Sequence, residues 1–160
     1  MLLAQSRHET ALGKDFMLFQ QADFQWSPGI NVICGTNSTG KTALIKLMYS
    51  LHKSYEQWNS TETKEAAVNR FSEKLCGVFR PDNRKVGRLV RRKQGNAQMT
   101  ASMGYENGTS IDVNFGNRAS KIATLILPKM EHTASPDHTA VYFPPKEIIS
   151  ATENFTSLYE

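Results

Sequence analysis

Eight consecutive residues of this chain, GTNSTGKT from Gly35 to Thr42, have the types and the spacing that bind a phosphate chain. They fit the pattern G-x-x-x-x-G-K-[ST], in which the backbone N–H groups of a loop converge on phosphates. Gly35 lets the chain turn sharply, Lys41 places a positive charge on the β- and γ-phosphates, and the Thr42 hydroxyl can bind Mg²⁺. The residues expected to hold the nucleotide are Gly35, Asn37, Ser38, Thr39, Gly40, Lys41 and Thr42, with Thr42 as the metal ligand.

The segments on both sides of this loop are those that a phosphate loop requires. Residues 30–34, INVIC, are mostly apolar and β-branched, which predicts a buried strand that leads into the loop. Apolar residues then recur at steps of three and four, which predicts a helix from about Lys41 to Trp58 whose positive end faces the phosphates. Cys34 is interpreted as a small core residue and not as a nucleophile. The alternative, a chance match of the pattern in an ordinary loop, does not explain this context.

Two further elements are expected near the loop and its helix. Residues 16–26, FMLFQQADFQW, predict two short strands joined around Gln20–Asp23. A second helix is expected to begin at a cap on Ser60 or Thr61 and to stop near Gly77.

Residues 85–116 predict an antiparallel β-meander, because apolar and polar residues alternate along them. A two-residue turn at Asn107-Gly108 would mix the two faces of the hairpin. A three-residue loop with Gly108 in the left-handed conformation pairs Met103 with Ile111 and collects the apolar side chains on one face. The sequence therefore favours the second register.

The rest of the chain is read from its turns and apolar runs. A turn at residues 94–96 is expected to bring Leu89 onto the apolar face of the meander. Two apolar runs, 122–127 and 140–143, are each followed by proline, and a helix is expected to start at Lys146.

The composition indicates a soluble globular protein. The chain has 160 residues, of which 39% are hydrophobic and 21% charged, with a net charge of +4 and a pI of about 9.1. The sequence has no apolar run of membrane-spanning length and no secretory signal at its start, so a cytoplasmic location is expected. Two cysteines, Cys34 and Cys76, fit a reducing compartment better than a disulfide framework.

The stretch SPGINVICGTNSTGKTALIKLM resembles the opening of ABC-type AAA ATPases of the structural-maintenance-of-chromosomes (SMC), Rad50 and RecF group. It is also similar to their bacterial AAA-type and overcoming-lysogenization-defect relatives. The resemblance is strongest over residues 15–50 and looser over 75–150, and the tail AVYFPPKEIIS resembles a segment of the bacterial members. One departure is Ser38, where the family usually has glycine. The matching residues are Asp23, Phe24, Pro28, Gly29, Asn31, Gly35, Asn37, Gly40, Lys41 and Thr42.

The resemblance implies the fold class, the ligands and the partners. The fold would be α/β, a P-loop NTPase, specifically an N-terminal ABC-ATPase lobe with a strand–P-loop–helix core plus an antiparallel β-meander. The ligands would be ATP and Mg²⁺. The full-length protein would be an ATPase and a homodimer that clamps ATP between its copies and acts on DNA, in DNA repair, or in antiviral defence. No membrane partner is expected.

The hydrolytic parts of that family are absent from the sequence, so no catalytic residue is assigned. Neither late apolar run ends in Asp-Glu, as a Walker B element would, and the signature motif and helical insertion are missing. His132 and His138 are interpreted as solvated, and Glu147 as a surface residue or, alternatively, a group near the γ-phosphate. Residues 1–160 are therefore expected to be a partial ATP-binding domain that needs the missing C-terminal lobe or a second ATPase subunit. Alternatives are a nucleotide-sensing module that recruits a partner without hydrolysis, and a small kinase.

A basic stretch between residues 80 and 93 contains seven cationic residues and only one acid, Asp82. It predicts a nucleic-acid contact, with DNA as the expected partner, or else an exposed edge protected from aggregation by its charge. The residues predicted to contact nucleic acid are Arg84, Arg88, Arg91, Arg92 and Lys93.

Overall fold

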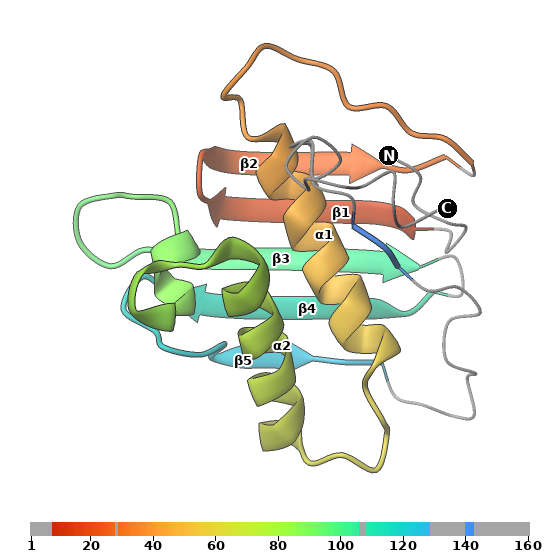
Figure 1. The fold of residues 1–160 in the computed structure, drawn as a ribbon, viewed down its shortest axis with the longest axis vertical. Helices are drawn as coiled ribbons and strands as arrows, with labels where there is room; N and C mark the ends of the chain where they lie inside the picture. Colours follow the sequence, from red (N-terminus) through yellow and green to blue (C-terminus); the bar gives the residue numbers. More distant parts are fainter. Residues whose placement is uncertain (1–7, 28, 106–107, 129–139, 143–160) are drawn as a thin grey trace, which may run out of the picture.

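The computed structural model describes residues 8–27, 29–105, 108–128 and 140–142. Within them, five strands form one antiparallel sheet of order β2-β1-β3-β4-β5, and two helices cover one of its faces (Figure 1). The strands are His8–Phe16 (β1), Phe19–Gln25 (β2), Gln98–Tyr105 (β3), Ser110–Gly116 (β4) and Thr124–Ile126 (β5). The helices are Lys41–Glu56 (α1) and Lys64–Phe79 (α2).

The hairpin of β3 and β4 has the register that side-chain alternation predicts. Met103 pairs with Ile111, Ala101 pairs with Val113, and Gly108 has a φ of 75°. Every second residue of β3 and β4 is buried against the helices, while the residues between them are partly or fully exposed. The prediction of the three-residue loop is confirmed, since only this register buries one clean face.

The hydrophobic core fills the space between the helices and the sheet. Apolar residues at helical spacing bring Leu47 and Leu51 of α1 and Phe71 and Leu75 of α2 into this layer. From the sheet side the core receives Met99, Met103, Ile111, Val113 and Phe115. The prediction of a helix after the phosphate loop is confirmed, although α1 ends at Glu56 rather than Trp58.

Three buried polar side chains connect the helices to the sheet. The Ser72 hydroxyl of α2 donates to the Val68 carbonyl at 2.7 Å and accepts the Ile122 N–H at 3.0 Å, just before β5. His52 Nδ1 of α1 lies 3.1 Å from the Tyr105 hydroxyl of β3. These contacts satisfy groups that burial would otherwise leave without partners.

The first hairpin differs from the prediction. Its turn is at Met17-Leu18, not around Gln20–Asp23, and β1 begins at His8. Phe16 pairs with Phe19 across a two-residue connection, and Met17 has a φ of 47°. Hairpin turns of this length need a positive φ, which glycine or asparagine usually supplies, so Met17-Leu18 gave no turn signal.

The second helix begins and ends later than predicted. Its cap is Thr63, whose hydroxyl oxygen accepts the Ala66 N–H at 3.2 Å, and it continues through Gly77 to Phe79. Phe79 packs edge-on against Phe16, with ring centroids 5.5 Å apart. Burying this ring outweighs the roughly 1 kcal/mol by which an internal glycine disfavours a helix.

The β-structure predicted over residues 85–116 is wrong for residues 85–97. A 3₁₀ turn at Asp82–Arg84 precedes this segment, which itself forms a second 3₁₀ turn, Val86–Leu89, and a single bridge between Val90 and Phe16. Leu89 is nevertheless buried, as expected. A β-carbon on Gly87 would lie 2.7 Å from the backbone carbonyl group of Asn117. The close approach of these two backbones fixes the course of the chain at Gly87, and the alternation of apolar and polar residues in the sequence cannot reveal it.

The end of the described chain is short. Of the apolar run 122–127, only Thr124–Ile126 is a strand. Residues 140–142 are not a strand, and the Ala140 N–H donates to Glu56 Oε2 of α1 at 3.1 Å. His132, His138, Glu147 and the helix expected from Lys146 lie outside the described residues. No helix in the described ranges is long and apolar enough to cross a membrane.

Candidate phosphate-binding loop

Residues 35–40 form a loop that ends on the N-terminus of α1. Gly40 caps the helix in the left-handed conformation, with φ 89° and ψ 5°, and its carbonyl accepts the Leu44 N–H at 3.0 Å. No side chain caps this helix and no acidic residue lies in its first turn. The first-turn N–H groups and the positive end of the helix dipole are therefore available to an anion.

The Lys41 side chain folds back over the loop. Its ammonium donates to the Gly35 carbonyl at 2.7 Å and to the Thr36 carbonyl, and it lies 3.5 Å from the Thr39 hydroxyl. Thr39 in turn donates to the Thr36 carbonyl at 2.9 Å. The loop thus holds a cation beside the N-terminus of α1, and the two together concentrate positive charge at this point of the surface.

Phe19 supports the loop from the sheet. A β-carbon at Gly40 would lie 2.8 Å from two carbons of the Phe19 ring. Phe19 begins β2, so the ring connects the sheet edge to the loop directly. The phosphate-loop pattern in the sequence requires glycine at position 40. The close contact with the Phe19 ring is a second reason for glycine there, and only the folded chain reveals it.

Ser38 also has a left-handed backbone, with φ 63°. This is the position at which the resembled family usually has glycine, which adopts that conformation without cost. For a residue with a β-carbon the left-handed region costs roughly 1–2 kcal/mol. Ser38 therefore keeps the shape of the loop at the expense of local strain.

Asn31 holds the turn that leads toward the loop. Its side-chain oxygen accepts the N–H and the hydroxyl of Ser27, both at 3.0 Å, and its amide donates to the Ser27 carbonyl at 2.8 Å. The sequence placed Asn31 in the family pattern without assigning it a role. The position of an asparagine just after a Pro-Gly turn could have indicated this role, because an asparagine side chain can replace backbone groups in the hydrogen bonds of a turn.

The buried strand predicted at Ile30–Cys34 is wrong. The segment has no regular secondary structure, Ile30 and Val32 are 74% and 76% exposed, and Cys34 is exposed rather than a core residue. Only Ile33 packs, against Leu44 and its neighbours. A buried strand needs strands beside it, and in the described sheet no strand is adjacent to this segment.

The predicted metal ligand, Thr42, is exposed in the first turn of α1. Asn37 is also exposed, in the turn of the loop. Within the described residues no group of three His, Cys, Asp or Glu side chains could hold a metal ion. The assignment of Thr42 as a Mg²⁺ ligand therefore stays a prediction.

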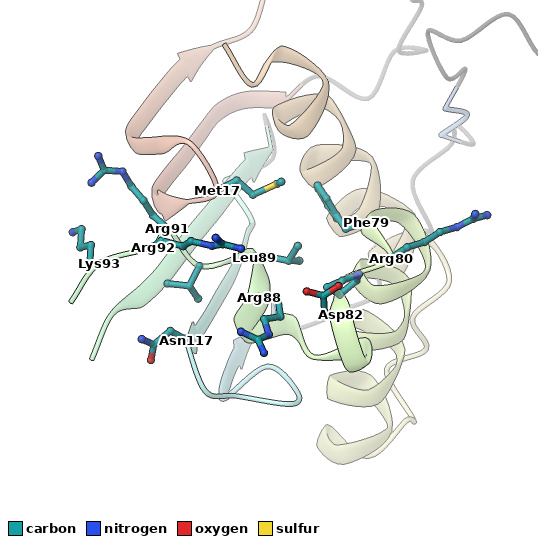
Figure 2. Close-up of a pocket in the computed structure, with 13 residues that line it drawn as sticks. Met17, Phe79, Arg80, Asp82, Arg88, Leu89, Arg91, Arg92, Lys93 and Asn117 are labelled. Carbon is teal, nitrogen blue, oxygen red and sulfur yellow. The ribbon is translucent and has the colours of Figure 1, made fainter. Parts of the chain in front are cut away.

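The predicted nucleic-acid residues divide into two groups. Arg88, Arg91, Arg92 and Lys93 line an open pocket of about 490 Å³, whereas Arg84 does not (Figure 2). The Lys93 ammonium forms an ion pair with Asp15 at 2.6 Å. The pocket and the phosphate loop share no residue.

Comparison with protein-family models, curated proteins and solved structures finds no significant match to this chain. Function is therefore argued from the geometry of the residues above.

Proposed function

We propose that this chain is the ATP- and Mg²⁺-binding lobe of an ABC-type ATPase of the SMC/RecF-like group. The observation that carries the proposal is the position of Lys41, whose ammonium is held by the Gly35 and Thr36 carbonyls beside the uncapped N-terminus of α1. Convergent N–H groups and a lysine point charge are what the phosphates of a nucleotide require. The left-handed Gly40 at the junction further supports it.

In this proposal each residue of the loop has one task. The N–H groups around residues 36–40 bind phosphate oxygens, and Lys41 leaves its carbonyl partners to neutralise the β- and γ-phosphates. Thr42 supplies a hydroxyl ligand to Mg²⁺, which would offset the charge of the phosphates when bound. Phe19 and Asn31 position the loop from outside.

The lobe by itself is proposed to bind nucleotide and to hydrolyse it poorly. Hydrolysis needs carboxylates that hold the metal and orient water, and the described residues offer no such cluster. We propose that a C-terminal lobe or a second ATPase subunit supplies them, and that the full-length protein is a cytoplasmic homodimer acting on DNA or in antiviral defence. The exposure of Ile30 and Val32, next to the loop, supports a partner on that side.

The same exposed segment supports the second candidate, a nucleotide-sensing module that recruits a partner without hydrolysis. A small kinase is less favoured, because kinases of the phosphate-loop class alternate parallel strands with helices, and the described sheet is antiparallel throughout.

The test is titration calorimetry of ATP with Mg²⁺ against the native chain and Lys41→Ala, with phosphate release measured on the same samples. We expect saturable binding by the native chain, at least tenfold weaker binding by the variant, and no multiple-turnover release. Arg118→Ala, which removes an exposed cation away from the loop, is the control. Equal affinity of the native chain and Lys41→Ala for ATP would overturn the proposal. Steady phosphate release by the native chain would overturn the part of it that says the lobe hydrolyses nucleotide poorly by itself.

A further inference from the structure

The pocket of about 490 Å³ is assembled from four separate parts of the chain. Met17 comes from the β1–β2 turn, Phe79 from the end of α2, Arg88 to Lys93 from the segment that begins in the second 3₁₀ turn, and Asn117 from the turn just after β4 (Figure 2). Two backbone hydrogen bonds join the first hairpin to the arginine-rich segment. The Met17 N–H donates to the Leu89 carbonyl at 2.8 Å, and the Arg91 N–H donates to the Asp15 carbonyl at 2.7 Å. It is therefore a feature of the tertiary fold, not of one basic segment.

The pocket carries more positive charge than the described part of the chain neutralises. Its cationic lining residues are Arg80, Arg88, Arg91, Arg92 and Lys93. Lys93 is paired with Asp15, but no ion pair engages the four arginines within the described residues, and the one acidic lining residue is Asp82. In Figure 2, Arg92 extends toward the centre of the pocket and Arg88 lies beside it, while Arg80 and Arg91 extend away. Guanidinium forks of this kind bind phosphate oxygens in pairs.

The floor of the pocket is apolar. Met17, which is 38% exposed, lines it together with Phe79 and Leu89 (Figure 2). Methionine thioethers make favourable contacts with flat aromatic groups. No aromatic residue is interleaved with the basic residues in the sequence, and Met17 and Phe79 reach the pocket from other elements.

We infer that this pocket binds a nucleoside phosphate, with the base against Met17 and the phosphate between Arg88 and Arg92. An apolar floor beside two guanidinium groups that form no ion pair with any described residue matches the two halves of that ligand, and the volume is within the range of small-ligand pockets, about 300–1,000 Å³. The ligand is either a residue of a single strand or a free nucleotide, which share this chemistry. The inference does not depend on the phosphate loop.

The experiment follows fluorescence anisotropy of labelled oligo(dT) of ten nucleotides and of the dinucleotide pTpT, without Mg²⁺ and in the Lys41→Ala background. Arg88→Gln/Arg92→Gln removes two charges from the pocket. The matched control is Arg84→Gln/Lys85→Gln, which removes two exposed charges outside it. We expect at least tenfold weaker binding for the pocket variant and less than twofold for the control. The salt slope for oligo(dT) should fall by about 0.7, since one phosphate is placed between the two arginines and each single-strand phosphate contact contributes about 0.7.

Met17→Ser tests the base contact at constant charge. It should weaken oligo(dT) or pTpT several-fold and leave binding of inorganic polyphosphate unchanged. Tight binding of oligo(dT) with weak binding of pTpT identifies a strand as the source, and equal affinity identifies a free nucleotide. Equal losses in the pocket and control variants, no saturable binding of either probe, or no effect of Met17→Ser would each overturn the inference.

Discussion

The Phe19 ring lies so close to Gly40 that a β-carbon at residue 40 would be 2.8 Å from two of its ring atoms. Phe19 opens β2 and Gly40 caps α1, so this contact joins the sheet edge to the loop that is proposed to bind phosphate. The contact and the left-handed φ of 89° both oppose any side chain at this position.

Gly40→Ala is therefore expected to destabilise the fold by at least about 1 kcal/mol, from the left-handed backbone alone, and to weaken ATP binding more than tenfold. Urea unfolding and calorimetry measure the two effects. A double-mutant cycle with Phe19→Leu isolates the steric part, which should appear as a coupling of roughly 0.5 kcal/mol or more. A cycle with no coupling would contradict a role for the ring.

Ser38→Gly should strengthen nucleotide binding. Ser38 has a φ of 63°, and glycine removes the cost of that conformation, so more molecules hold the loop in its binding shape. A gain of 1 kcal/mol corresponds to about fivefold in affinity. Asn37→Gly is the control, because Asn37 has no positive φ. The same gain from both variants, or a loss from Ser38→Gly, would count against the strain at Ser38.

Ser72→Ala should destabilise the protein by about 1–3 kcal/mol, because the buried Ile122 N–H loses its acceptor. Ser54→Ala is a matched control: that serine is also fully buried in a helix, but its hydroxyl donates at 2.8 Å to a carbonyl of the same helix, from Ser50. Its loss should cost less, since alanine favours the helix. Urea unfolding compares the two variants, and equal stability would refute the loss of the Ile122 N–H bond as the cause.

The stability of the protein should fall in alkali. Burial raises the pKa of Tyr105 above its ordinary 10.0, so the unfolded chain loses this proton first. The contribution of Tyr105 is complete below about pH 10 and decreases as the pH rises further, by at most about 1.4 kcal/mol per pH unit. Tyr105→Phe should make the curve of unfolding free energy against pH less steep above pH 10. It should also lower stability at pH 8 by about 1 kcal/mol, through the lost contact with His52.

Local patterns predicted those parts of the fold that local physics decides. The helix after Lys41 follows from apolar spacing, and the pairing of Met103 with Ile111 follows from alternation, because a slip by one residue would expose the whole apolar face. The loop itself follows from its glycines and lysine. Each of these features depends on neighbours within a few residues along the chain, or on the burial of one apolar face of a helix or strand.

The tertiary structure decided what depends on distant segments. Ile30–Cys34 has the composition of a buried strand, but its burial requires strands that the described sheet does not place beside it. The basic stretch became a pocket only because Met17 and Phe79 are brought to Arg88 and Arg92 by the packing of the first hairpin on α2. A sequence indicates which apolar groups should be buried and which charges should be paired. The tertiary fold decides which groups come into contact, because contact energies depend on neighbours in space and not on neighbours along the chain.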